Sequence, residues 1–263
     1  MLTTLLLLAG LAAGLADVEE VAAVAASTAD PRLQQADSLF RAGAPAQALE
    51  LALKVAEARG NEERSAYEPL WRAASFALGL GVVEEAEDRS TDRYRQALEL
   101  AREARALEPE RVDARYWEVA ALGRLALEAG TREAADYGEA IHQGATWILE
   151  REPDHHGAHH ALGKLYMEVM QVSGISRFLG RTFTGSTALR EASWERAELH
   201  LQRAQELAPE MALYRLDLAR LHAERGRIDE ARNLVEELLA DPVRQPPDRV
   251  FRNEARELLR TLT

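Results

Sequence analysis

The chain has 263 residues, a formal net charge of −12 and no cysteine. The absence of cysteine excludes disulfide bonds, a cysteine nucleophile, a thiolate metal site and a lipid-modified cysteine anchor. The excess of acidic residues opposes sequence-independent binding to nucleic acid or to an anionic membrane surface, so no nucleic-acid partner is expected. The composition is 47% hydrophobic but only 6% aromatic. No stretch of the sequence shows the alternation of β-branched residues that is typical of strands. The sequence therefore predicts an all-α protein.

The amino terminus has the features of a secretory signal. A short apolar run, Leu5–Leu15, precedes Ala16 and an acidic stretch that begins at Asp17. The run is too short for a transmembrane helix, and small residues before a polar stretch suit cleavage. We therefore expect residues 1–16 to be a signal peptide and residues 17–30 a tether, in an exported, periplasmic protein. Because the first residues carry no positive charge, the alternatives are a misplaced start codon and an uncleaved segment that associates peripherally with a membrane.

Recurring helical hairpins are expected from residue 31 onward. The first covers Leu33–Arg59 and turns at Gly43. The second pairs a helix over residues 65–80 with one over residues 91–107. Gly79 and Gly81 are expected to end the first of these helices, which leaves an insertion of roughly ten residues relative to a standard unit.

The third and fourth hairpins share an Ala-Leu-Gly phrase, which starts at Ala121 and again at Ala161. We expect its glycines, Gly123 and Gly163, to permit a close crossing with the paired helix. Within the fourth hairpin, an insertion over residues 173–190 is rich in glycine and carries aromatic and basic side chains. This insertion is the most unusual segment of the chain.

The fifth hairpin covers residues 211–242 and shows the pattern most clearly. Apolar residues recur at steps of three and four on both sides of Gly226, and Pro242 ends the unit. The layout resembles the tetratricopeptide repeat, with Ala219 at the small position and Ala231 at the helix crossing. An amphipathic helix over residues 249–262 is expected to cap the array. The sequence thus predicts a tetratricopeptide-like α-solenoid over residues 31–263.

The second half of the chain resembles a more specific family, the regulators of microtubule dynamics, which includes a mitochondrial outer-membrane tethering protein. The resemblance covers residues 88–262 and rests on Trp117, His155–Gly163, Gly174–Ser186, Trp194–Ala197, Pro209–Tyr214 and Asn253–Leu259. It implies a curved helical array with an internal groove and, from the tethering member, an ability to hold a phospholipid. Because an export signal is expected in place of a mitochondrial anchor, a microtubule or tethering role does not carry over.

The groove is the candidate binding site. First helices of such hairpins face the concave surface, and methionine adapts to flexible ligands. In the insertion, aromatic side chains are expected to fold over one end of the array, with arginines facing water or an anionic head group. The candidate residues are Trp117, His159, Tyr166, Met167, Met170, Arg177, Phe178, Arg181 and Phe183.

Four histidines form two pairs four residues apart, His155 with His159 and His156 with His160. This spacing lets imidazoles chelate a transition metal, but no accompanying carboxylate motif is present, so histidines that line the groove or face solvent are the main expectation. The segment from Gly180 to Ser186 lacks the lysine of a phosphate-binding loop. No catalytic residue, metal or other cofactor is therefore predicted.

These observations favour a non-enzymatic scaffold whose groove binds a protein segment or an apolar, acidic ligand such as a lipid. Two alternatives stay open. One is the periplasmic partner subunit of certain tripartite transporters, which is similar in outline but usually carries a lipidated cysteine. The other is a metal-dependent enzyme at the histidine cluster.

Overall fold

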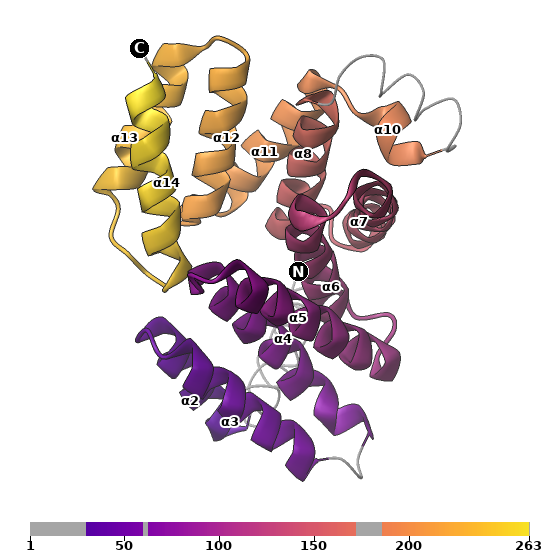
Figure 1. Cartoon of the computed structure of the whole chain (residues 1–263). Helices are drawn as coiled ribbons and strands as arrows, with labels where there is room; N and C mark the ends of the chain where they lie inside the picture. The colour runs from indigo at the N-terminus through magenta and orange to yellow at the C-terminus, as the bar shows by residue number, and fades with distance from the viewer. Residues whose placement is uncertain (1–29, 60–62, 172–185, 263) are drawn as a thin grey trace, which may run out of the picture.

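The computed structural model describes residues 30–59, 63–171 and 186–262, and every regular element in these ranges is a helix (Figure 1). Consecutive helices pair as hairpins: α2 (Pro31–Arg41) with α3 (Pro45–Ala58), α4 (Tyr67–Val83) with α5 (Glu87–Leu107), α6 (Val112–Glu128) with α7 (Thr131–Arg151), α8 (His156–Gln171) with α11 (Trp194–Leu207), and α12 (Ala212–Glu224) with α13 (Ile228–Ala240). The short elements η1 (Glu63–Ala66) and α10 (Thr187–Glu191) precede α4 and α11, and α14 (Pro247–Thr261) ends the array. None of the described helices is both long enough and apolar enough to span a membrane.

Local sequence sets the ends of several helices. The Asp30 side chain accepts a hydrogen bond of 2.9 Å from the backbone N–H of Arg32 at the start of α2, and the Ser193 side chain caps α11 in the same way. Gly43 and Gly226 turn the first and fifth hairpins with φ angles of 91° and 74°, a region that side chains with a Cβ rarely adopt. The turns predicted at these two glycines are confirmed.

The position predicted for the extra residues of the second hairpin, between its two helices, is wrong. Helix α4 continues through both of its glycines, and the extra residues lengthen α4 and α5 instead of forming a loop. A Cβ atom on Gly79 would lie 2.5 Å from the ring of Phe40, and one on Gly81 would lie 2.6 Å from the ring of Tyr94. These glycines therefore make room for aromatic rings of neighbouring helices, a role that sequence alone does not distinguish from helix termination.

The two glycines of the Ala-Leu-Gly phrases have different surroundings. A Cβ on Gly163 would lie 2.7 Å from Cγ of Leu201 and 3.0 Å from the carbonyl oxygen of Ala197, so the close crossing of α8 and α11 is confirmed. A Cβ on Gly123 would meet no atom within 4 Å. The prediction for Gly123 is wrong, because its side of α6 is open rather than covered by a paired helix.

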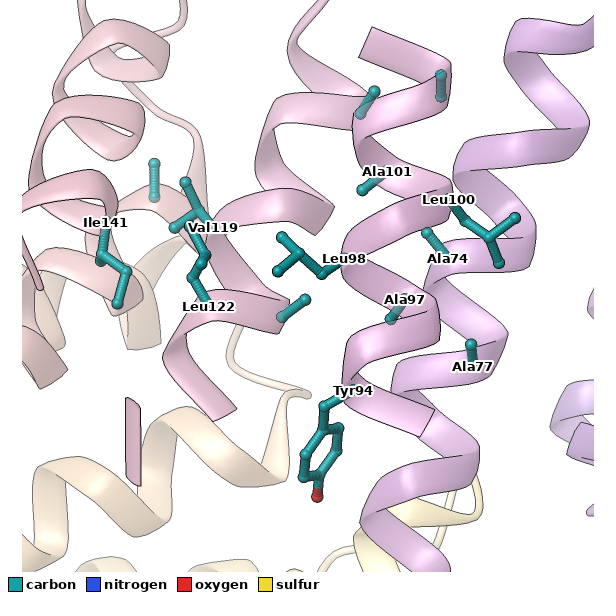
Figure 2. Close-up of a cluster of buried hydrophobic side chains, with 14 of the residues drawn as sticks. Ala74, Ala77, Tyr94, Ala97, Leu98, Leu100, Ala101, Val119, Leu122 and Ile141 are labelled. Atoms are coloured by element: carbon teal, nitrogen blue, oxygen red, sulfur yellow. The ribbon is translucent and has the colours of Figure 1, made fainter. Parts of the chain in front are cut away.

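Several of the side chains buried between the paired helices α4 and α5 are alanines. Figure 2 shows Ala74 and Ala77 of α4 facing α5, where Ala97 and Ala101 lie, and all four are fully buried. Alanine lets two helices approach closely, because it adds little beyond the backbone. Larger buried side chains of α5, α6 and α7 fill the next layer, among them Leu98, Val119, Leu122 and Ile141.

The array curls until its last helix contacts an early one. Helix α14 packs on α12 and α13, which confirms the predicted cap, and it also packs on α4. Val82, near the end of α4, joins the cluster of buried residues that contains Phe251 of α14. Helices α4, α6, α8 and α12, each the first helix of its hairpin, and the cap α14 contact one another in a closed succession; we refer to these five as the first helices. This closure was not predicted.

Candidate functional site

The side chains where the first helices meet form what we call the inner face. On α8, His160, Lys164 and Glu168 lie one turn apart and share one side of the helix. On α6, Trp117 and Arg124 lie two turns apart on one side in the same way. The inner face consists of Trp117, Arg124, Leu127, His160, Lys164, Glu168, Asp217, Arg220, Phe251 and Glu254.

A buried carboxylate organises the centre of the inner face. Asp217 of α12 is only 1% exposed, and His160 Nε2 of α8 donates a hydrogen bond of 2.8 Å to its Oδ2. Its Oδ1 accepts a hydrogen bond of 3.0 Å from Arg220 and lies 3.5 Å from the Lys164 ammonium. Arg220 also donates a hydrogen bond of 2.6 Å to Glu254 of α14. These ion pairs connect three first helices.

The charges around Asp217 determine its protonation. Burial opposes ionisation, but Lys164, His160 and Arg220 outweigh it and hold the pKa of the carboxyl group well below its usual range. Burial also opposes the charge of Arg220, yet its two carboxylate partners raise the pKa of the guanidinium. Asp217 and Arg220 are therefore both ionised at neutral pH, and the hydrogen bonds of the network fix the orientations of its members.

Aromatic rings continue this arrangement toward the start of α8. His156 Nδ1 lies 2.8 Å from the Tyr214 hydroxyl, and the His160 ring stacks on the Tyr214 ring at 4.5 Å. The backbone N–H of Ala158 donates to His155 Nδ1, so this histidine caps α8. Burial lowers the pKa of both His155 and His156, which keeps them neutral near pH 7.

A second histidine group lies between α8 and the second helices. His159 Nε2 donates to the carbonyl oxygen of Pro153, and its Nδ1 lies 2.9 Å from His200 Nδ1. Burial, with a further contribution from His159, lowers the pKa of His200 to about 4. Nearby, His142 Nε2 lies 3.1 Å from the Tyr166 hydroxyl, and burial raises the pKa of that hydroxyl to about 12.

The four histidines predicted as a cluster face different partners. His155 and His156 contact tyrosines, His159 faces His200, and His160 faces Asp217. Among the described residues, no group of three or more His, Cys, Asp or Glu side chains could hold a metal ion. The four imidazoles lie on two sides of α8, so the spacing of four residues does not bring them together as metal ligands.

The predicted groove residues occupy three kinds of position. Trp117 is half-buried on the inner face, whereas His159 is half-buried against α11. Tyr166 and Met167 are 2% and 1% exposed, so their prediction as groove-lining residues is wrong; they belong to the hydrophobic core. Met170 packs half-buried against the same core. The predictions for the N-terminal residues 1–29 and for Arg177, Phe178, Arg181 and Phe183 lie outside the described residues.

Sequence reasoning missed the most connected residues of the site. Asp217 lies between Leu216 and Leu218 in an apolar helix, and an isolated acidic residue in such a run is a signal for a buried ion pair. Two partners of Asp217, His160 and Lys164, lie on another helix, α8, so local spacing could have identified only Arg220, three residues further along α12. His142 and His200 likewise lie far apart in the sequence and approach the same tyrosine, Tyr166.

The surface also contains two depressions lined mainly by polar side chains. One has a volume of about 560 Å³ and is lined by Glu110, Arg111, Val112, Asp113, Arg151, Glu152 and His155. The other has a volume of about 130 Å³ and is lined by Arg41, Ala42, Gly43, Val243, Arg244, Gln245, Pro246 and Arg249. Neither resembles the apolar groove that the sequence predicted for a lipid-like ligand.

Comparison with protein families identifies the chain. The family model described as regulator of microtubule dynamics protein 1-3 matches residues 32–263. The chain belongs to this family. The match extends the predicted resemblance, which started at residue 88, through the first hairpin of this family member. No curated protein matches the chain.

Comparison with solved structures finds proteins that are similar to this family member. A thermophilic TPR protein of Thermus thermophilus is 20% identical with a TM-score of 0.59, and the alignment covers 87% of this chain and 97% of that chain. MamA of Desulfovibrio magneticus is 18% identical with a TM-score of 0.42, over 88% of this chain and 94% of that chain. The likeness to the Thermus protein concerns the fold alone, and it confirms the predicted tetratricopeptide-like α-solenoid.

Proposed function

We propose that this protein is an interaction scaffold and that its inner face binds a segment of a partner protein. The observation that carries the proposal is the set of side chains on one side of α6. Trp117 is half-buried there, and Leu127 is 55% exposed. The guanidinium of Arg124 lies 5.6 Å from the Phe251 ring, and within the described residues it has no carboxylate within 4.0 Å. Tryptophan and arginine dominate the binding energy of protein interfaces when they are surrounded by apolar contacts.

The fixed charges beside α6 support the same function. The ion pairs of Asp217 are already formed, so their side chains lose little conformational freedom when a partner binds. They also link α8, α12 and α14, the helices that a bound segment would cross. Fixed charges next to the exposed Leu127 and the half-buried Trp117 favour one orientation of a bound extended or helical segment.

Two exposed leucines allow a matched test by photo-crosslinking. Leu127 lies on the inner face, whereas Leu199 lies on the second helix α11 and is 63% exposed. A photoreactive phenylalanine analogue placed at either position should be tolerated, because both side chains are mainly in solvent. We expect a protein adduct of defined mass from position 127 in cells of the source organism and none of that mass from position 199. Equal adducts from both positions, or none from position 127, would contradict the proposal.

The finer predictions from the sequence remain separate proposals. A lipid-like ligand would depend on Arg177, Phe178, Arg181 and Phe183, which lie outside the described residues. Export, peripheral membrane association and a role as a transporter partner depend on residues 1–29, which are also outside them. The inner face supports the protein-segment version more directly, because its described side chains are mostly polar and already paired.

A further inference from the structure

The smaller depression lies where the two ends of the array meet. Its walls come from the turn of the first hairpin, Arg41 to Gly43, and from the segment that leads into α14, Val243 to Arg249. In Figure 1 the end of α2 lies below the connection between α13 and α14. The depression therefore joins residues that are about two hundred positions apart, and it exists only because the array curls back on itself.

Three arginines and no acidic residue line this depression. Arg41, Arg244 and Arg249 are all exposed, and within the described residues none of their guanidinium groups has a carboxylate within 4.0 Å. Other arginines of the chain, such as Arg72, Arg151 and Arg215, do pair with carboxylates. Three arginines without carboxylate partners at one small depression create a local positive potential.

The nearby acidic residues make no ion pair with these arginines, although Oδ1 of the buried Asp248 has no hydrogen-bond partner among the described residues. Asp248 is 3% exposed, and its Oδ2 accepts hydrogen bonds from the backbone N–H groups of Arg244 and Gln245, so it holds the loop rather than a guanidinium. Asp37 of α2 pairs with Arg72, and Asp241 pairs with Arg215. The three arginines of the depression are therefore available to bind an anion from solution.

We propose that this depression binds a phosphate group, and that the bound phosphate joins the first hairpin to the C-terminal cap. Arginine presents a planar set of donors that matches phosphate oxygens, and phosphate offers several acceptor oxygens and close to two negative charges at pH 7. The volume of about 130 Å³ is below the roughly 300 Å³ of sites that enclose a drug-sized ligand. It accommodates free phosphate or the phosphate end of a larger molecule. This site is separate from the inner face and does not depend on the function proposed there.

Isothermal titration calorimetry of the full chain tests the site directly. Inorganic phosphate and phosphoserine are titrated separately at constant ionic strength, with sodium chloride as the compensating salt. The variants are Arg41→Gln on the first hairpin and Arg249→Gln on the cap. The matched control is Arg132→Gln, which removes one positive charge from an exposed arginine at the start of α7.

We expect saturable, one-to-one binding of phosphate, weakened about tenfold or more by each of Arg41→Gln and Arg249→Gln and unchanged by Arg132→Gln. If phosphoserine binds at least as tightly as inorganic phosphate, the source is a phosphorylated molecule; if only inorganic phosphate binds, the source is the free ion. Absence of saturable binding would overturn the proposal. An equal loss of phosphate affinity in Arg132→Gln would also overturn it, because such a loss indicates general charge attraction. A loss of affinity in only one of Arg41→Gln and Arg249→Gln would overturn it as well. Because Arg41, Arg132 and Arg249 are all exposed, we expect circular dichroism to show that the three variants are folded.

Discussion

The histidine pair between α8 and α11 predicts how the stability of this protein depends on pH. The pKa of His200 is about 4 in the fold against about 6.5 for an unperturbed histidine. Between these two values the unfolded chain binds a proton that the folded chain does not bind. The stabilising contribution is therefore complete above pH 6.5 and is lost as the pH falls toward 4.

The size of the effect follows from the difference between the two pKa values. A difference of about 2.5 units corresponds to roughly 3 kcal/mol of unfolding free energy lost between pH 7.5 and pH 4. Burial lowers the pKa of His155, His156 and His222 as well, so these groups add to the loss with the same sign. Asp217 contributes only at lower pH, because its carboxyl group stays ionised throughout this window.

Urea unfolding followed by circular dichroism, at several pH values from 7.5 to 4.5, measures this dependence. The test variant is His200→Gln, which keeps a side-chain donor for His159 but cannot be protonated. We expect the variant to lose stability less steeply with falling pH than the parent chain does, and the two curves to converge toward pH 4.5. Parallel curves over the whole range would refute the assignment of the pH dependence to His200.

Two further predictions concern packing and the inner face. Gly163→Ala should lower the free energy of unfolding by about 1–3 kcal/mol, because its Cβ would overlap Leu201, whereas Gly123→Ala should raise it by about 0.5–1 kcal/mol, because the added Cβ meets open space on a helix. Thermal unfolding of the two variants checks this pair, and a loss of stability in both would contradict it. Asp217→Ala should cost about 3 kcal/mol, because it leaves His160, Lys164 and Arg220 around a site without a carboxylate. Urea unfolding measures this loss, and a change of less than about 0.5 kcal/mol would show that the network does not hold the first helices together.

Much of the fold could be predicted from the sequence, because each hairpin carries its own local signals. Apolar steps of three and four residues, the turns at Gly43 and Gly226 and the final amphipathic helix all identify elements without any knowledge of their neighbours. The errors arose where a residue serves a distant helix. Gly79 and Gly81 make room for rings of other helices, and a glycine that does so looks like one that ends a helix.

The candidate site was less predictable for the same reason. Trp117 lies on the first helix of its hairpin, as expected, but the spacing along α8 could not tell which side of that helix the core covers. Tyr166 and Met167 lie in the core, whereas His160, one of the four clustered histidines, lies on the inner face. The closure of α14 on α4 depends on the accumulated curvature of all the hairpins, and no single segment of the sequence contains that information.

The most direct test of the central claim is the affinity for the partner that crosslinks to position 127. Biolayer interferometry would compare the parent chain with Arg124→Ala on the inner face and with Arg132→Ala, an exposed arginine at the start of α7. We predict that Arg124→Ala weakens binding by more than about tenfold, as expected for an arginine at the centre of an interface, and that Arg132→Ala changes it by less than about twofold. Equal affinities for all three chains would show that the partner does not bind the inner face.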